Sequence, residues 1–266
     1  MKGGIFLKYI ILTKRSLTVI TAVVLSLLLT AFGVYGRKNN LKAAAATADG
    51  KLVPIYCVET NEKKVAVTFD AAWGADDTER LIEILKNHNA KATFFVVGEW
   101  AEKYPDSVKA FYAAGHEIGN HSASHKMYSR LSEDETINDI TLCNESIKKA
   151  IGVSPALLRA PSGDYSNDTV NAATKLNMKT IQWSVDSLDW KGLGTDEIVK
   201  RVTEKTECGS IILFHNDIKN TPDALDRILT ELEKKGYSFV TVSELIYDSD
   251  YKIDSAGKQI KNAAAN

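Results

Sequence analysis

Short apolar runs alternate with amphipathic stretches along most of the chain. Seven of these runs are short and rich in β-branched or aromatic residues, which is typical of buried strands, and helical stretches lie between most of them. The predicted strands cover residues 65–69, 93–97, 117–120, 157–159, 180–185, 210–214 and 238–241. Strands and helices that alternate in series predict a parallel sheet, either closed into a (β/α) barrel or doubly wound.

Two helices between these strands carry boundary signals. Ser132 and Glu135 form a capping box at the start of a helix that reaches Ala150. Pro222 stands in the first turn of another helix, which Gly236 ends. The length of 266 residues suits one α/β barrel, a fold that commonly runs to roughly 250 residues.

The N-terminal part of the chain carries a separate signal. Residues 16–35 are uncharged and dense in Leu, Val, Ile and Ala, and a helix of about 20 residues can span about 30 Å of hydrocarbon. Residues 1–15 hold only basic charges, which favours a cytoplasmic start, although Arg37 and Lys38 weaken that bias. A cleaved signal peptide with a small-residue site within 44–48 is the alternative, but the long apolar run favours a retained transmembrane anchor. Both interpretations predict an extracytoplasmic body. A retained anchor would tether it to the membrane through residues 16–35, whereas a cleaved signal peptide would leave it secreted.

The rest of the chain divides into three parts. Residues 36–60 are interpreted as a linker and the start of the body, residues 61–248 as the body, and residues 249–266 as a polar tail that is expected to fray. Three widely separated cysteines allow at most one disulfide. Each of them, Cys57, Cys143 and Cys208, is expected to be a small buried residue rather than a catalytic thiol.

The charge distribution bears on the partner. Hydrophobic residues make up 44 % of the chain and charged residues 25 %, which predicts a globular protein. All seven charged residues before Ala43 are basic, so removing them from the net charge of -1 leaves the remainder at -8. Because phosphate binding needs a basic face, an acidic body predicts a neutral or cationic substrate and no nucleic-acid partner.

Unusual polar residues follow the predicted strands at their carboxyl ends. In a parallel barrel these ends share one rim, so residues far apart in the chain are expected to converge there. The residues at these positions are Asp70, His121, Arg159, Asp186, Asp189 and His215.

Two of these positions suggest particular chemistry. His121 and His125 are four residues apart, and in a helix or tight turn both imidazoles would lie on one face, a start for a Zn²⁺ or Co²⁺ site that still needs a third ligand. Asp70 ends an apolar strand and could act as a base, with Arg159 as its cationic partner. The structural alternatives are ordinary surface histidines, an aspartate that caps a turn, and a buried His215 without a catalytic role.

Five segments at these positions together resemble the polysaccharide deacetylase family, the NodB-like carbohydrate esterases, over about residues 63–247. In chain order they are T-F-D-A-A-W-G at 68–74, H-S-A-S-H at 121–125, R-A-P-S-G at 159–163, D-S-L-D-W at 186–190 and L-F-H at 213–215. Single motifs of this length have little specificity, whereas five in the family's order are very specific. The F-D-x-x-W-G form of the first segment resembles the sporulation-associated branch of the family, which is linked to the spore cell wall.

The resemblance implies a distorted (β/α) barrel of about seven parallel strands, preceded here by one N-terminal hydrophobic helix. It also implies metal-dependent removal of acetyl groups from N-acetylglucosamine or N-acetylmuramic acid units of a cell-wall glycan. Asp70 would be the general base, held by Arg159, and His215 would be the general acid, oriented by Asp189. The residues that would contact substrate are Pro161, Ser162, Asp186, Trp190 and Leu213. The contact at Pro161 would come from the backbone N–H that follows it, and Ser162 stands where the family usually has an aromatic residue.

One departure from the family concerns the metal. His121 and His125 would hold a divalent cation, zinc or cobalt by the resemblance, but the family's third ligand, an aspartate directly after the base, is Ala71 here. A site with two histidines would bind metal with low affinity unless Asp76, Asp77, water or substrate adds oxygen ligands.

Three functions fit these observations. The first is a peptidoglycan deacetylase that uses a metal-activated water. The second is a glycan-binding pseudoenzyme of the same fold, inactive or weakly active because it lacks the third ligand. The third is a related deacylase that acts on chitin-like, xylan-like or small N-acyl substrates.

Overall fold

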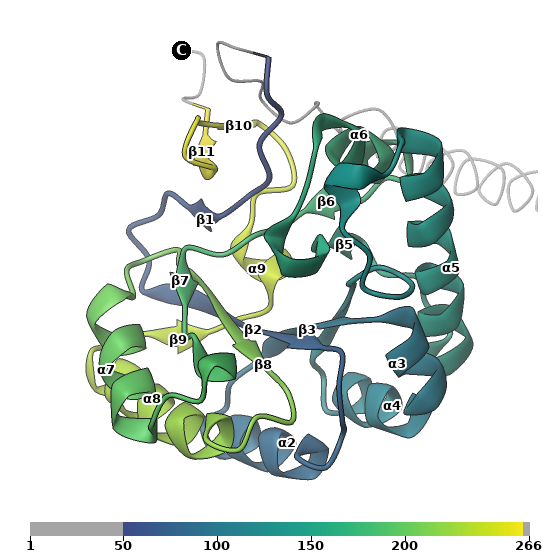
Figure 1. The fold of residues 1–266 in the computed structure, drawn as a ribbon. Coiled ribbons are helices and arrows are strands. Elements are labelled where there is room, and N and C mark those ends of the chain that lie inside the picture. The colour runs from purple at the N-terminus through teal and green to yellow at the C-terminus, as the bar shows by residue number, and fades with distance from the viewer. Residues whose placement is uncertain (1–49, 263–266) are drawn as a thin grey trace, which may run out of the picture. The chain divides into compact units, whose positions relative to one another are not determined.

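A curled parallel sheet forms the centre of the protein. The computed structural model describes residues 50–262, and seven parallel strands in it curl into a half-barrel, which confirms the predicted α/β barrel class. The spatial order of the strands is β6-β5-β4-β3-β2-β8-β7, and a short strand, β9, pairs with the start of β2 (Figure 1). The strands are β2 (Lys64–Ala71), β3 (Ala92–Val96), β4 (Glu117–Asn120), β5 (Leu157–Leu158), β6 (Lys179–Thr180), β7 (Val185–Asp186), β8 (Ile211–His215) and β9 (Ser238–Phe239).

Helices follow most of the strands and surround the sheet (Figure 1). The predicted capping box is present, because the Ser132 side chain accepts a hydrogen bond from the Glu135 N–H at the start of α5. Pro222 lies in the first turn of α8, as predicted. The helices are α2 (Thr78–Asn87), α3 (Gly98–Lys103), α4 (Pro105–Ala113), α5 (Glu133–Ile151), α6 (Asn167–Lys175), α7 (Thr195–Lys205), α8 (Thr221–Lys234) and α9 (Val242–Leu245), with 3-10 turns η1 (Tyr128–Arg130), η2 (Pro161–Gly163) and η3 (Asp189–Lys191).

The segment predicted as one strand over 180–185 is two strands. Its first residues end β6 at one edge of the sheet, and its last residue begins β7 at the other edge. Only residues 181–184 separate them, a connection that spans at most roughly 18 Å when fully extended. The two edges must therefore lie close together, and this connection across the open side keeps the sheet curled. The alternation of apolar and polar residues over 180–185 did not reveal the break.

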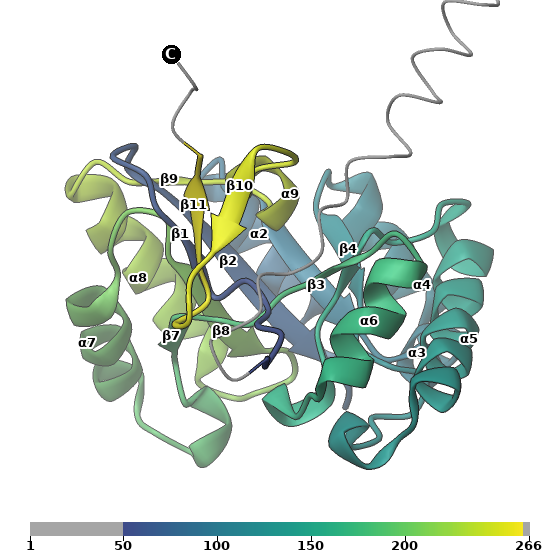
Figure 2. The ribbon, with the colours of Figure 1, turned by 90° about the horizontal axis from the view of Figure 1, so that it is seen from above.

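The C-terminal segment is ordered, so the expectation of a frayed tail is wrong for residues 251–261. Strands β10 (Tyr251–Ile253) and β11 (Lys258–Lys261) form a hairpin, and β11 also pairs in parallel with β1 (Cys57–Val58) (Figure 2). The Gln259 side chain is fully buried and exchanges two hydrogen bonds with the backbone of Tyr247, at 2.8 and 2.9 Å. Apolar periodicity did not predict this hairpin because much of its stability comes from backbone pairing and one buried amide.

The remaining predictions about organisation have mixed outcomes. The basic start 1–15 and the apolar segment 16–35 lie outside the described residues, as does most of the linker 36–60. Within residues 50–262, no helix has both the length and the apolar character that crossing a membrane requires. The three cysteines are free thiols, and Cys143 is buried as expected, whereas Cys57 and Cys208 are partly exposed because both line a surface pocket.

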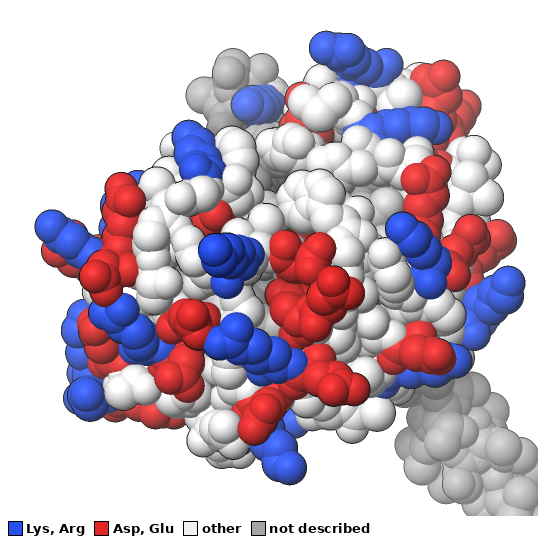
Figure 3. Space-filling model, turned by 60° about the horizontal axis from the view of Figure 1, so that its bottom comes forward, with Lys and Arg blue, Asp and Glu red and all other residues white. Residues whose placement is uncertain are grey.

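The surface carries both signs of charge. On the face shown in Figure 3, acidic and basic side chains are interspersed, and a group of acidic side chains lies near the centre. This face is therefore mixed in charge and not predominantly basic.

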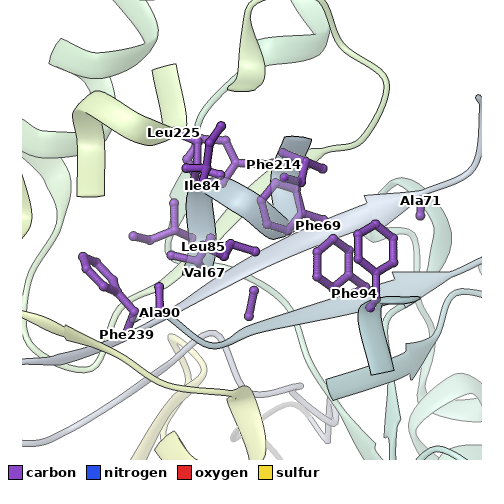
Figure 4. Close-up of a cluster of buried hydrophobic side chains, with 14 of the residues drawn as sticks. Val67, Phe69, Ala71, Ile84, Leu85, Ala90, Phe94, Phe214, Leu225 and Phe239 are labelled. Atoms are coloured by element: carbon purple, nitrogen blue, oxygen red, sulfur yellow. The ribbon is translucent and has the colours of Figure 1, made fainter. Parts of the chain in front are cut away.

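The main core lies between the sheet and its helices. Side chains alternate along β2, and Val67 and Phe69 point into this core, with Ala71 at its edge, while Phe69 stacks on Phe94 with 4.8 Å between ring centroids (Figure 4). Full burial of a side chain such as Phe69 stabilises the fold by roughly 1.5–3 kcal/mol. The same alternation turns Asp70 to the opposite face of the strand, inside the half-barrel.

His116, to which the sequence assigned no role, is a buried neutral histidine. Its Nδ1 accepts a hydrogen bond from the Ala92 N–H at 3.3 Å, and its Nε2 is buried without a partner. Burial, with a smaller contribution from the charge of Lys91, lowers the pKa of His116 to about 4. Protonation would place a second donor against the Ala92 N–H, so the folded state resists it.

We predict that His116 makes the protein less stable in mild acid. Because its folded pKa lies below the unfolded value of about 6.5, its contribution is complete above that pH and falls by about 2 kcal/mol between pH 7 and pH 5. His116→Asn keeps an acceptor for the Ala92 N–H and should lose this part of the pH dependence. Urea unfolding of both proteins at pH 7 and pH 5 measures it, and equal losses in the two proteins would contradict the prediction.

Candidate active site

The strand-end residues predicted from the sequence converge on one cavity. Its volume is about 570 Å³, and it opens at the carboxyl ends of the parallel strands. Asp70 and His215 are direct neighbours across β2 and β8, which brings the predicted base and acid together. Arg159, Asp189 and Pro161 are buried and do not line the cavity. The lining residues are Asp70, Ala72, Trp73, His121, His125, Ser162, Trp183, Asp186, Trp190, Leu213, His215 and Ile218.

A buried ion pair fixes the position of Asp70. Nη1 of Arg159 donates to Asp70 Oδ1 at 2.8 Å and to the Thr68 hydroxyl at 2.9 Å, and Nη2 donates to the Gln182 carbonyl at 3.1 Å. The guanidinium lies over the ring of Phe95, 4.1 Å from its centroid, and no part of Arg159 reaches solvent. The sequence predicted Arg159 and Asp70 but not Thr68 and Gln182. Threonine and glutamine do not by themselves indicate a functional site, and their contacts with Arg159 are seen only in the folded structure.

This environment keeps Asp70 ionised. Burial alone would raise the pKa of Asp70, but its electrostatic interactions with His121, Arg159 and His215, together with the hydrogen bond from Arg159, outweigh burial and hold it below the usual value. Its second oxygen, Oδ2, lies 3.4 Å from Nε2 of His121. A carboxylate in this state can accept a proton at neutral pH.

The two histidines of the H-S-A-S-H segment lie together in a tight turn, not in a helix. Their ring centroids are 5.0 Å apart, and the His125 N–H donates to the Ser122 hydroxyl at 2.7 Å. Nδ1 of His121 lies 2.8 Å from the Arg159 carbonyl, an acceptor, which assigns the proton to Nδ1 and leaves the Nε2 lone pair available. Burial lowers the pKa of His121 to about 4 and also lowers the pKa of His125, so both rings are neutral.

These residues fit a divalent cation with one protein ligand missing. Two neutral imidazoles, one with its tautomer set by a backbone carbonyl, are the donors that zinc and similar metals use. Ala71, the last residue of β2, is fully buried at the edge of the hydrophobic core, and its methyl group supplies no ligand (Figure 4). Asp77, a possible substitute, instead accepts the Asp217 N–H at 2.7 Å. Within the described part of the chain, no group of three His, Cys, Asp or Glu residues could hold a metal.

His215 is held by a buried carboxylate. Its Nδ1 lies 2.7 Å from Asp189 Oδ1, and Asp189 Oδ2 accepts its backbone N–H at 2.8 Å. Asp189 is fully buried and also accepts bonds from the Thr221 hydroxyl and the Trp190 N–H. Burial would lower the pKa of His215, but the bond to Asp189 and nearby carboxylate charges outweigh it and raise the pKa. The sequence did not single out Thr221, which stands directly before Pro222.

The predicted substrate contacts lie around the cavity. Ser162 has a left-handed backbone in η2, with φ 55°, and Pro161 lies buried beneath it. Asp186, Leu213 and Trp190 line the wall, and Trp190 is 52 % exposed. Their roles stay predictions, since position alone does not assign function.

Two tryptophans at the cavity were not predicted as substrate contacts. Trp73 lies three residues after Asp70, is 51 % exposed, and has its ring centroid 5.5 Å from that of His215. Trp183 lies in the segment that crosses between the sheet edges. Trp73 was visible in the first motif, but only the structure shows that its side chain reaches the cavity.

The sequence matches known deacetylases. Residues 58–181 match the family described as polysaccharide deacetylase. The chain is 39 % identical over 193 residues to a peptidoglycan-N-acetylglucosamine deacetylase of Bacillus cereus, with 71 % of this chain and 70 % of that protein covered. It is 36 % identical over 188 residues to the peptidoglycan-N-acetylmuramic acid deacetylase PdaC of Bacillus subtilis, with 71 % of this chain but only 40 % of that protein covered.

Solved structures agree with these matches. A pseudoenzyme of carbohydrate esterase family 4 from Bacillus anthracis superposes with a TM-score of 0.71 at 34 % identity, covering 79 % of this chain and 73 % of that one. A mutant of this pseudoenzyme with restored enzymatic activity gives the same TM-score at 37 % identity, covering 74 % of this chain and 72 % of that one. Fold and site together define a half-barrel of the carbohydrate esterase type. The chain belongs to the polysaccharide deacetylase family.

We predict that Ala71→Asp raises the affinity for zinc and makes folding depend on it. Without metal, a carboxylate added at the edge of the core should destabilise the protein by about 1–3 kcal/mol. With Zn²⁺, a third ligand should tighten binding on the order of tenfold or more. Competition with a chromophoric chelator and thermal unfolding with and without Zn²⁺ measure both effects. His125→Ala in the same background should remove the gain, and an unchanged affinity in Ala71→Asp would show that position 71 does not reach the metal.

Proposed function

We propose that this protein hydrolyses the N-acetyl groups of an N-acetylated cell-wall glycan, with peptidoglycan as the polymer. The observation that carries the proposal is the pairing of Asp70 and His215 as neighbours at one cavity, with the pKa of Asp70 lowered and that of His215 raised. A base that is ionised and an acid that is protonated are what amide hydrolysis requires of its two proton-transfer groups.

The proposed reaction proceeds in two proton transfers. Asp70 takes a proton from the attacking water as its oxygen bonds to the acetyl carbon. His215 then donates a proton to the amide nitrogen as the carbon–nitrogen bond breaks, giving acetate and a free amine. A divalent cation held by His121 and His125 would supply Lewis acidity that stabilises negative charge on the amide oxygen. The backbone N–H of Ser162 would add a hydrogen bond to the same oxygen.

The relatives support peptidoglycan as the substrate, since one is named for N-acetylglucosamine and another for N-acetylmuramic acid. Both sugars therefore belong in the assay. The proposal includes an extracytoplasmic body tethered through residues 16–35, which would place the cavity near the cell wall. A place in sporulation rests on the F-D-x-x-W-G form of the first motif and is part of the same proposal.

A glycan-binding pseudoenzyme is the second candidate. Ala71 leaves the metal one protein ligand short, and the fold superposes on a family pseudoenzyme. The tryptophans that line the cavity are not metal ligands, so glycan binding would survive the loss of turnover. Metal content and acetate release distinguish these two candidates from each other. Activity on small N-acyl substrates would distinguish both from a third candidate, a deacylase of different specificity.

We predict metal-dependent acetate release from the full chain. Protein loaded with Zn²⁺ or Co²⁺ should release acetate from peptidoglycan or N-acetylglucosamine oligosaccharides, and Asp70→Asn and His125→Ala should each lower the rate by about 10²-fold or more. His88→Gln is the matched control, because His88 bonds to Asp226 and Glu233 away from the cavity and should keep wild-type activity. Wild-type protein that carries metal but releases no acetate from any substrate would favour the glycan-binding candidate.

The pH profile should report on His215. A general acid with a raised pKa stays protonated, and active, above the usual histidine range near 6.5, and loses activity as the pH rises past that pKa. Asp189→Asn removes the main bonding partner that raises this pKa, so the alkaline limb of kcat/KM should move to lower pH and the maximum rate should fall. An alkaline limb at the same pH in both proteins would assign it to another group.

A further inference from the structure

The four tryptophans of the chain all lie at or beside the cavity. Trp73, Trp183 and Trp190 line it, and Trp100 is buried behind the loop that carries Trp73. Trp73 and Trp190 are each about half exposed, at 51 % and 52 %, although a large aromatic ring normally gains stability by burial. An exposed indole at the edge of a cavity therefore suggests a binding surface.

The backbone that presents Trp73 is held rigidly. The Gly74 carbonyl accepts hydrogen bonds from the Trp100 indole N–H at 2.9 Å and from the Asn216 amide at 2.6 Å, and both donors are buried. The Asp217 carboxylate packs so closely on Gly74 that an added Cβ would lie 2.0 Å from its Oδ2. Helix α3 and the loop after β8 thus fix this backbone, yet the ring itself stays open to solvent.

We propose that Trp73 is the platform on which a hexosamine ring of the substrate stacks. The apolar face of a pyranose matches an indole in size and character, and a rigid aromatic surface binds at a low cost in conformational entropy. The ring centroids of Trp73 and His215 are 5.5 Å apart, so a sugar stacked on Trp73 lies beside the proposed proton donor. Trp73 would then select N-acetylhexosamine polymers over small N-acyl compounds, an inference that rests on the proposed glycan substrate.

Binding to glycan tests this role without turnover. The full chain is freed of metal with EDTA and titrated calorimetrically with the tetrasaccharide of N-acetylglucosamine. Trp73→Ala should weaken binding roughly tenfold, and Trp73→Tyr should recover most of it, since a phenol ring also stacks. Tyr112→Ala is the matched control: this exposed aromatic residue lies on α4 and does not line the cavity, so binding should stay at the wild-type level.

Kinetics on the metal-loaded protein give a second readout. Trp73→Ala should raise KM for the tetrasaccharide by about the same factor and change the KM for a small N-acetyl substrate much less. Trp73→Ala that binds the tetrasaccharide as well as the wild type overturns the inference and leaves the proposed function standing. Wild-type protein that neither binds glycan nor releases acetate overturns both, whereas Trp73-dependent binding without acetate release supports the inference and favours the pseudoenzyme.

Discussion

The buried ion pair between Arg159 and Asp70 is the interaction on which the site depends. Both charges lie inside the half-barrel, where each would be costly alone, and removing one partner of such a pair typically destabilises a protein by about 3–5 kcal/mol. Arg159 acts twice, since its guanidinium holds Asp70 and its carbonyl holds Nδ1 of His121. Arg159, the residue directly after β5, therefore positions both the proposed base and a proposed metal ligand.

A second buried carboxylate organises the opposite wall. Asp189 receives hydrogen bonds from the backbone and ring of His215, from Thr221 at the start of α8, and from its own neighbour Trp190. These bonds join β8, η3 and α8, so the orientation of His215 is determined by the fold and not by a mobile side chain. The two carboxylates have different partners. Asp70 is paired with a guanidinium and stays ionised as the proposed base, whereas Asp189 is paired with the imidazole of His215, the proposed acid.

The sequence predicted the features that local chemistry determines. The β4 boundaries, the capping box at Ser132 and the strand-end positions of Asp70 and His215 follow from periodicity and residue type. The break within residues 180–185 depends on pairing partners elsewhere in the chain, and the hairpin at 251–261 is joined to the body through the distant strand β1, so no local pattern encodes either feature. Thr221 and Gln182 contribute to the site through contacts that exist only after the sheet has curled.

Ala71 connects the stability of the fold to the chemistry of the site. It packs in the main core, so an aspartate here, as the family pattern has, would be a carboxylate at the edge of an apolar cluster that needs a cation nearby. With alanine, this part of the core is apolar and needs no cation nearby. Metal binding is thereby separated from packing at position 71, and the proposed glycan site does not include this position. The proposed hydrolase and its glycan-binding alternative therefore share Asp70, Arg159, His215 and the tryptophans, and they differ in whether His121 and His125 hold a metal that supports turnover.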